Sequence, residues 1–318
     1  MDAPLPPAHR LMSAKLALLV ALGLFAVFYL AVLVRGARQA RLRSADRGTA
    51  TAAGGGTGFV TNFLDTLGIG SFATTTAIFR QWRMVRDERI PGTLNVGHTL
   101  PTIAQAFIFT TLVPVGAKTL IGMIAAAILG AWLGAGVVSG WQRQRVQAGM
   151  GLALIAMALI MAWRTGVGDP TGGNLLELNG TLLVLALAGN FFLGMLMTLG
   201  IGLYAPCMIL VSLLGMNPKA AFPIMMGSCA FLMPVASARF VREQAFDLPA
   251  ALGLLIGGVP AVLIAGLLVQ SLPLTVVKWI VVAVVLYTAT TLLLAARKTQ
   301  VGEDLTPPVP NEPGVVTP

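Results

Sequence analysis

Charged residues are scarce in this sequence of 318 residues. Lys and Arg contribute 21 and Asp and Glu 12, so charged side chains make up 10% of the chain, whereas hydrophobic residues make up 56%. A soluble globular domain has about 25% charged residues, and so few charges do not cover a water-exposed surface. The composition therefore excludes an ordinary soluble enzyme and an intrinsically disordered chain.

Cysteine and histidine are also rare, with two residues of each. Two cysteines, Cys207 and Cys229, are too few for a disulfide framework or a metal cluster. The sequence has no CxxC, HExxH or P-loop motif, so we expect no metal, no cofactor and no ATP-driven step by the chain itself. The net charge of +9 does not indicate nucleic-acid binding, because the basic residues lie in short clusters between apolar runs, the pattern of membrane loops.

Long apolar runs dominate the chain instead. The first, from Leu16 to Val34, exceeds the apolar region of about 7–15 residues in a signal peptide, and arginines follow it. It predicts a permanent signal-anchor helix, with a basic, Gly-rich and flexible linker up to residue 56. The other apolar runs lie at 57–79, 94–114, 118–138, 146–163, 181–214, 219–238, 249–269 and 274–296. The Pro-rich tail, 297–318, is expected to be disordered.

An internal repeat divides the core of the chain. The pentapeptide TLGIG at residues 66–70 recurs at residues 198–202, an offset of 132. Small residues spaced four apart form a second match at offset 131, with Gly122, Ala126, Gly130 and Gly134 in one half and Gly253, Gly257, Ala261 and Ala265 in the other. Such stripes let helix backbones approach closely in lipid. We therefore predict two all-α halves, 57–165 and 181–296, joined by a loop at 166–180.

The distribution of basic residues predicts how these halves cross the membrane. If every apolar run spans, Lys and Arg divide evenly between the two sides, 11 to 10. If the two runs that contain the pentapeptide enter and leave on the same side, the division becomes 15 to 6. The positive-inside rule favours the second arrangement. Each half then has one broken, re-entrant element and three spanning helices, so the second half is inverted, as in many secondary transporters.

The Gly-x-Gly positions in the pentapeptide are the candidate binding site. A helix broken there exposes backbone N–H groups and half-helix N-termini, which favour anions. The alternative is that these glycines only permit tight helix packing. The candidate substrate-binding residues are Thr66, Gly68, Gly70, Ser71, Thr74, Thr198, Gly200, Gly202, Tyr204 and Ser228.

Two ionisable residues lie inside apolar runs, where such residues are costly and usually functional. Asp65 precedes the first Gly-x-Gly, and His98 lies in the run 94–114. Both are candidates for proton coupling. The alternatives are a helix cap for Asp65 and a hydrogen-bonded packing residue for His98.

Two tripeptides occupy matching places in the halves, Gly97-His98-Thr99 and Gly227-Ser228-Cys229, at offset 130. Their small polar side chains either line a shared cavity or form hydrogen bonds between helices. Thiol chemistry by Cys207 and Cys229 is a weaker hypothesis, because buried cysteine usually acts as a small hydrophobic residue.

Over about 57–296 the chain resembles the sulfite exporter TauE/SafE family of bacterial membrane anion permeases. Members open each half with a glycine-rich segment followed by proline, and residues 200–206, GIGLYAP, match this well. Residues 217–220, NPKA, followed by Gly227-Ser228, and the small-residue helix 129–135 also resemble the family. The first half departs from it, with Thr74 in place of proline and His98-Thr99 in place of the usual Thr-Ser pair.

The resemblance implies export or uptake of small sulfur-containing or organic anions, such as sulfite, thiosulfate or sulfonates, across the bacterial inner membrane. With the repeat, it favours a secondary transporter that works by alternating access, with a small anion and the lipid bilayer as partners. A channel or a membrane subunit of a larger assembly is the main alternative. An intramembrane serine hydrolase that uses Ser71 and His98 is a weaker one. The sequence leaves oligomeric state, direction and coupling ion open.

Overall fold

The protein is helical throughout the part described by the computed structural model, residues 8–42, 52–138, 142–166, 173–197 and 202–304. In chain order the α-helices are α1 (Ala8–Leu42), α2 (Ala52–Thr66), α3 (Ser71–Gln81), α4 (Ile90–Leu112), α5 (Ala117–Val138), α6 (Arg143–Gly166), α7 (Gly180–Met197), α8 (Tyr204–Leu213), α9 (Ala221–Glu243), α10 (Leu248–Ser271) and α11 (Leu274–Asp304). Short 3-10 helices, η1 (Asp87–Arg89) and η2 (Pro218–Ala220), precede α4 and α9. Within these ranges no β-strand forms, and the predicted all-α fold is confirmed.

Six of the described helices are long and apolar enough to cross a membrane, namely α1, α6, α7, α9, α10 and α11. Large apolar side chains such as Leu24, Trp163 and Leu267 are exposed on them, which is typical of helices that face lipid. α4 is of similar length but more polar, and most of its side chains are buried in the bundle. The chain is therefore a multi-pass membrane protein.

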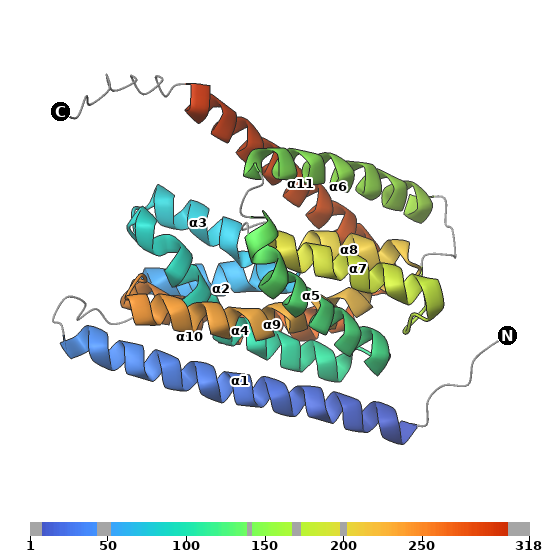
Figure 1. Cartoon of the computed structure of the whole chain (residues 1–318), viewed down its shortest axis with the longest axis horizontal. Helices are drawn as coiled ribbons and strands as arrows, with labels where there is room; N and C mark the ends of the chain where they lie inside the picture. The colour runs from blue at the N-terminus through green and yellow to red at the C-terminus, as the bar shows by residue number, and fades with distance from the viewer. Residues whose placement is uncertain (1–7, 43–51, 139–141, 167–172, 198–201, 305–318) are drawn as a thin grey trace, which may run out of the picture.

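The N-terminal helix α1 lies along the outside of the bundle, where it packs on α4 and α9 (Figure 1). Its inner face buries Leu22 and Tyr29, and the Tyr29 hydroxyl donates a hydrogen bond to the Val96 carbonyl on α4. Val27 and Phe28, on its other face, are exposed. The predicted N-terminal transmembrane helix is thus confirmed.

The boundary between the linker and the first half differs from the prediction. Residues 52–56, AAGGG, were expected in a flexible linker but form the first turns of α2. Their glycines are tolerated in a helix because α10 packs directly on them: a Cβ atom on Gly257 would lie 1.9 Å from the Gly55 carbonyl oxygen. Small residues that permit a close helix crossing have the same composition as a flexible linker, which is why the sequence predicted a linker here.

The helices on either side of residue 180 follow the same order. η1, α4, α5 and α6 begin at residues 87, 90, 117 and 143, and η2, α9, α10 and α11 begin 131 residues later, at 218, 221, 248 and 274. α2 and α7 end at residues 66 and 197, with the same separation, and each precedes a shorter helix. The spacing of the helices thus agrees with the offset found in the sequence, and the division into two halves stays a prediction.

The broken helix of each half packs on a helix of the other half. α2 of the first half packs on α10 of the second, and α7 of the second half packs on α5 of the first. Two further pairs, α4 with α9 and α6 with α11, join helices that begin 131 residues apart. Each of these four helix pairs crosses between the predicted halves.

The small-residue stripes lie at these crossings, as the sequence predicts. On α10, a Cβ on Gly253 would lie within 3 Å of the α2 backbone at Gly54. On α5, a Cβ on Gly130 would lie 1.9 Å from the Phe191 carbonyl oxygen of α7. Such close approach of backbones replaces the hydrophobic driving force that lipid does not provide.

Each broken unit enters and leaves at one end of the bundle. The chain before α7 pairs with the chain after α8, since the Asn217 N–H donates to the Leu175 carbonyl at 2.9 Å. The start of α2 and the end of α3 lie together at the opposite end (Figure 1). Both broken units therefore return to the end of the bundle at which they begin, and re-entrance in the membrane stays a prediction.

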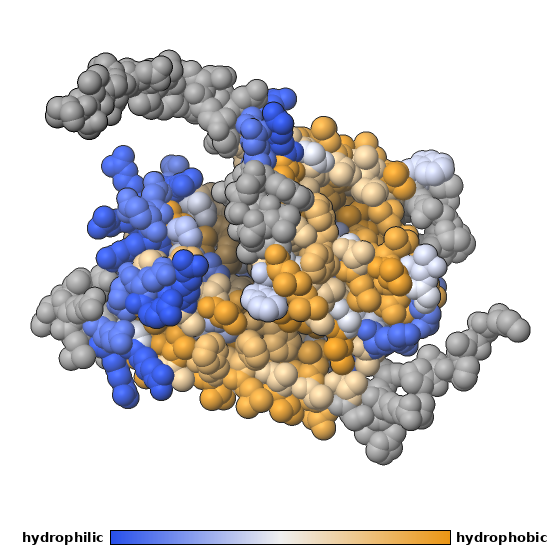
Figure 2. Space-filling model, viewed as in Figure 1, coloured by the Kyte–Doolittle hydropathy of each residue, from blue (hydrophilic) through white to orange (hydrophobic). Residues whose placement is uncertain are grey.

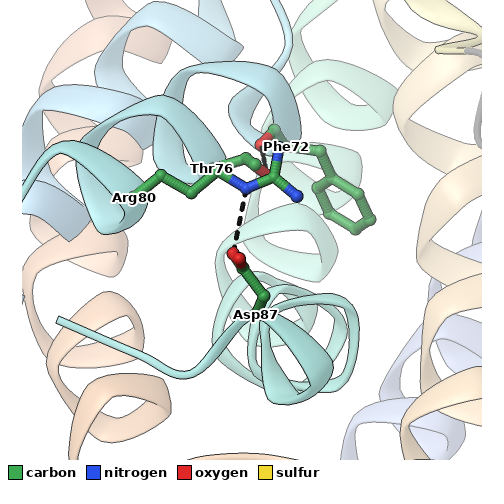
Figure 3. Close-up of polar contacts among 4 residues, drawn as sticks. All are labelled: Phe72, Thr76, Arg80 and Asp87. Atoms are coloured by element: carbon green, nitrogen blue, oxygen red, sulfur yellow. Dashed lines mark hydrogen bonds and ion pairs between the residues drawn. The ribbon is translucent and has the colours of Figure 1, made fainter. Parts of the chain in front are cut away.

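The end of the bundle at which α3 ends and α4 begins is hydrophilic, whereas the middle is covered by apolar side chains (Figure 2). Arginines from α3, the 82–89 segment and α9 gather here. One of them, Arg80, pairs through Nε with Asp87 Oδ1 at 3.0 Å and so ties the end of α3 to η1 (Figure 3). The positive-inside rule predicts that this end faces the cytoplasm.

Candidate functional site

The first helix break lies between α2 and α3. Gly68 and Gly70 have φ angles of 97° and 87°, a region that side chains with a Cβ rarely adopt. The Gly68 and Ile69 N–H groups fold back to the carbonyls of Asp65 and Leu64, and a new helix begins at Ser71. The predicted break at the first Gly-x-Gly is confirmed.

The carboxylate of Asp65 lies at the start of the second half-helix. Its Oδ1 accepts a hydrogen bond from the Ser71 backbone N–H at 2.6 Å, and only 2% of the residue is exposed. A negative group at a helix N-terminus satisfies a free N–H and complements the helix dipole. The helix-cap interpretation of Asp65 therefore describes its position, and in the described part of the chain it has no ion pair.

Gln105 of α4 connects the first break to the second. Its Nε2 donates to Asp65 Oδ2 and to the Thr66 hydroxyl, both at 2.9 Å. Its Oε1 accepts a longer bond, 3.4 Å, from the Tyr204 hydroxyl. Because Tyr204 is the first residue of α8, this fully buried amide joins the two broken elements.

His98 occupies a neighbouring part of the same network. Its Nδ1 lies 3.0 Å from Asn62 Oδ1, and its Nε2 lies 3.0 Å from the Thr75 hydroxyl. Asn62 Nδ2 donates to the Gly58 carbonyl, so Asn62 Oδ1 is an acceptor for His98. Nδ1 therefore carries a proton, and in the neutral ring Nε2 accepts from the Thr75 hydroxyl, so that both nitrogens are bonded.

The other candidates lie around this network without joining it. Thr74 bonds within its own turn, to the Gly70 and Ser71 carbonyls, and Ser228 bonds to the Ile224 carbonyl of its own helix. Gly202 is exposed just before α8. Thr198 and Gly200 lie outside the described residues.

For the matching tripeptides, the interpretation as hydrogen bonds between helices gains support at Thr99. The Thr99 hydroxyl of α4 lies 2.9 Å from the Ser237 hydroxyl of α9, a hydrogen bond between helices of the two halves. Gly97 and Gly227 contact neighbouring helices closely, at Leu254 and Ile124. Cys207 and Cys229 are both free and buried.

Two network members were missed in the sequence: Asn62 and Gln105. A signal was present, because His98, Thr102 and Gln105 recur at helical spacing and mark one polar face of α4. On α2, Asn62, Asp65 and Thr66 are spaced i, i+3, i+4 and likewise mark one polar face. The positions of these polar stripes in facing helices follow only from the fold.

We expect His98→Leu to destabilise the protein by about 2–3 kcal/mol, because it leaves the buried Asn62 oxygen and Thr75 hydroxyl without partners. Thermal unfolding in detergent measures the loss. Thr76→Val is the matched control, because the Thr76 hydroxyl bonds only the Phe72 carbonyl of its own helix (Figure 3). Equal stability of the two variants would contradict a packing role for His98.

These features define a class of protein: a multi-pass helical membrane protein in which two broken elements are joined by a buried polar network. The model of the family described as Sulfite exporter TauE/SafE matches residues 181–317. The resemblance to this family is thus confirmed from α7 onward, and for the first half it stays a prediction. No curated protein and no solved structure matches the chain.

Proposed function

We propose that this protein is a secondary transporter of small sulfur-containing or organic anions, such as sulfite or sulfonates, in a bacterial inner membrane. The family match supports a membrane transporter of the anion-exporter type rather than an enzyme. The proposed site comprises the two breaks and their neighbouring hydroxyl groups, with Thr66, Gly68, Gly70 and Ser71 from the first half.

Open space at both breaks is the observation that carries this proposal. A Cβ built on Gly70 or on Gly202 meets no atom within 4 Å, whereas a Cβ on Gly130 or Gly257, at helix crossings, would lie 1.9 Å from a backbone oxygen. Each of the two precedes the start of a half-helix, α3 or α8. A small anion has room there to reach backbone N–H groups, which bind anions without a Lys or Arg side chain.

The exchange of broken helices supports alternating access. Each broken element packs on a helix of the other half, so a rocking motion between halves changes the surroundings of both breaks together. The bond from Tyr204 to Gln105 joins the two breaks in the present conformation. We expect it to open and close during the transport cycle.

The geometry is unfavourable for an intramembrane serine hydrolase. A serine nucleophile needs a hydrogen bond to its base, but His98 bonds Thr75 and Asn62 through its two ring nitrogens. Ser71 instead uses its backbone N–H to bond Asp65.

Flux of sulfite, thiosulfate and methanesulfonate into proteoliposomes tests the proposal. We expect Gly202→Leu to lower the rate about tenfold or more, equivalent to about 1.4 kcal/mol in binding, with unchanged thermal stability because its Cβ position is free. Gly149→Leu, at an open and exposed position of α6, is the matched control. Flux by the wild type that Gly202→Leu leaves unchanged would contradict a site at the second break.

The same flux measurement distinguishes a transporter from a channel and from a subunit of a larger assembly. Rates far above those of a transporter favour a channel. Absence of flux for all three anions, with the purified chain folded, favours a subunit that needs a partner.

A further inference from the structure

Asp65 is a buried carboxylate in the space where the proposed function places an anion. It lies in the last turn of α2, and its Oδ1 accepts a hydrogen bond from the first N–H of α3, at Ser71 beside Gly70. Its other oxygen accepts from the neutral amide of Gln105. None of these contacts supplies a positive charge that would offset the negative charge of a bound anion.

Among the residues that the structure describes, the groups around Asp65 supply no cation. The ionisable side chains beside it are the Tyr204 phenol of α8 and the Cys229 thiol of α9, which are neutral or negative. α10, which packs on α2, has no ionisable residue between Leu248 and Ser271. His98 of α4 is bonded at Nδ1 to Asn62 and at Nε2 to Thr75. The ionisable residues of α3 and α11, Arg80, Lys278, Tyr287 and Arg297 among them, lie on exposed surfaces or toward the helix ends.

We propose that Asp65 is the proton-binding residue of the transport cycle, and that a proton and the anion bind together and cross in the same direction. The inference rests on the proposed function. An anion near Gly70 repels an ionised Asp65 and favours its protonation, and by linkage a proton on Asp65 favours the anion equally. Protonation also weakens the hold of Asp65 on the Ser71 N–H, which becomes available to the anion.

The structure selects Asp65 over His98 as the coupling residue. A second proton on His98 would require the Thr75 hydroxyl to reverse, and no carboxylate contacts the ring in the described part of the chain. Asp65 gains from protonation whenever the anion arrives, whereas both ring nitrogens of His98 already have hydrogen-bond partners.

The test uses methanesulfonate, a monovalent anion whose charge does not change with pH, in proteoliposomes of the full chain. With one proton per anion no net charge moves. We therefore expect wild-type uptake to follow an imposed pH gradient and to ignore an imposed potassium diffusion potential. Asp65→Asn keeps an oxygen for the Ser71 N–H but binds no proton, so its uptake should ignore the pH gradient and follow the potential. His98→Gln should behave as the wild type.

A change from pH-driven to voltage-driven flux is a result that a merely structural role does not produce. Wild-type flux that follows voltage alone, or an Asp65→Asn variant that still follows the pH gradient, overturns the inference and leaves the transporter proposal intact. Absence of wild-type flux for all three anions overturns both.

A second measurement needs no variant. Methanesulfonate added to the wild type in weakly buffered detergent solution should be accompanied by uptake of about one proton per bound anion. Its affinity should rise as the pH falls, by up to about tenfold per pH unit. Binding without proton uptake overturns the inference.

Discussion

Replacing Gln105 with leucine is expected to destabilise the protein by about 3 kcal/mol or more. The substitution removes both Nε2 hydrogen bonds, at 2.9 Å, so that the Asp65 carboxylate depends mainly on the Ser71 N–H. Hydrogen bonds to charged groups are worth about 1.5–3 kcal/mol, and an unpaired buried charged group costs more than an unpaired neutral one. Unfolding in detergent, followed by intrinsic fluorescence, measures the loss.

The matched control is Asn95→Leu on the same helix, because the Asn95 amide bonds only the Pro91 carbonyl one turn away. A double-mutant cycle adds Asp65→Leu. Because that change removes the charge that Gln105 stabilises, the double variant should lose clearly less than the sum of the two single losses. Strict additivity would mean that Gln105 and Asp65 do not interact energetically.

Substitution of Gly130 by leucine is expected to have the largest effect on folding. A Cβ at this position would lie 1.9 Å from the Phe191 carbonyl oxygen, a backbone atom that no side-chain rotation moves. α5 and α7 would have to separate, and their close packing would be lost along its length. We expect a cost above about 3 kcal/mol, the upper end of the range for overpacking, and little folded protein on size-exclusion chromatography.

Gly149→Leu controls for the added side chain, because Gly149 is exposed on α6 with nothing near its Cβ position. It should elute and unfold as the wild type. The equivalent crossing of α2 and α10 gives an independent check, because a Cβ on Gly257 meets the Gly55 carbonyl oxygen at the same 1.9 Å. Gly257→Leu should therefore fail in the same way, and a folded variant at either position would contradict close backbone packing at these crossings.

Much of the fold could be predicted because it follows from local patterns. Apolar runs give the helices, the repeated pentapeptide locates the first break, and basic residues indicate which runs return to the side they entered. The start of α2 was missed for a physical reason: residues 52–56 have the composition of a linker, and only the presence of α10 explains why they are helical.

Part of the site could also be predicted from local sequence position. Asp65, Ser71 and Tyr204 stand beside the glycines that mark the breaks, so sequence position alone identified them. Gln105 and Asn62 are polar residues in otherwise apolar helices, and their importance depends on which helices face each other. That information is not local, because α8 and α4 are brought together by contacts between residues about a hundred positions apart.

The exchange of broken helices between the halves also has a consequence for biogenesis. When α2 leaves the ribosome, its partner α10 has not yet been synthesised. Until then α2, a glycine-rich helix that contains Asp65, has no helix to pack on in the membrane. Neither half carries the partner of its own broken element. We therefore expect the halves, when expressed as separate polypeptides, to be unstable alone and to accumulate only when produced together, as a quantitative immunoblot of membranes would show.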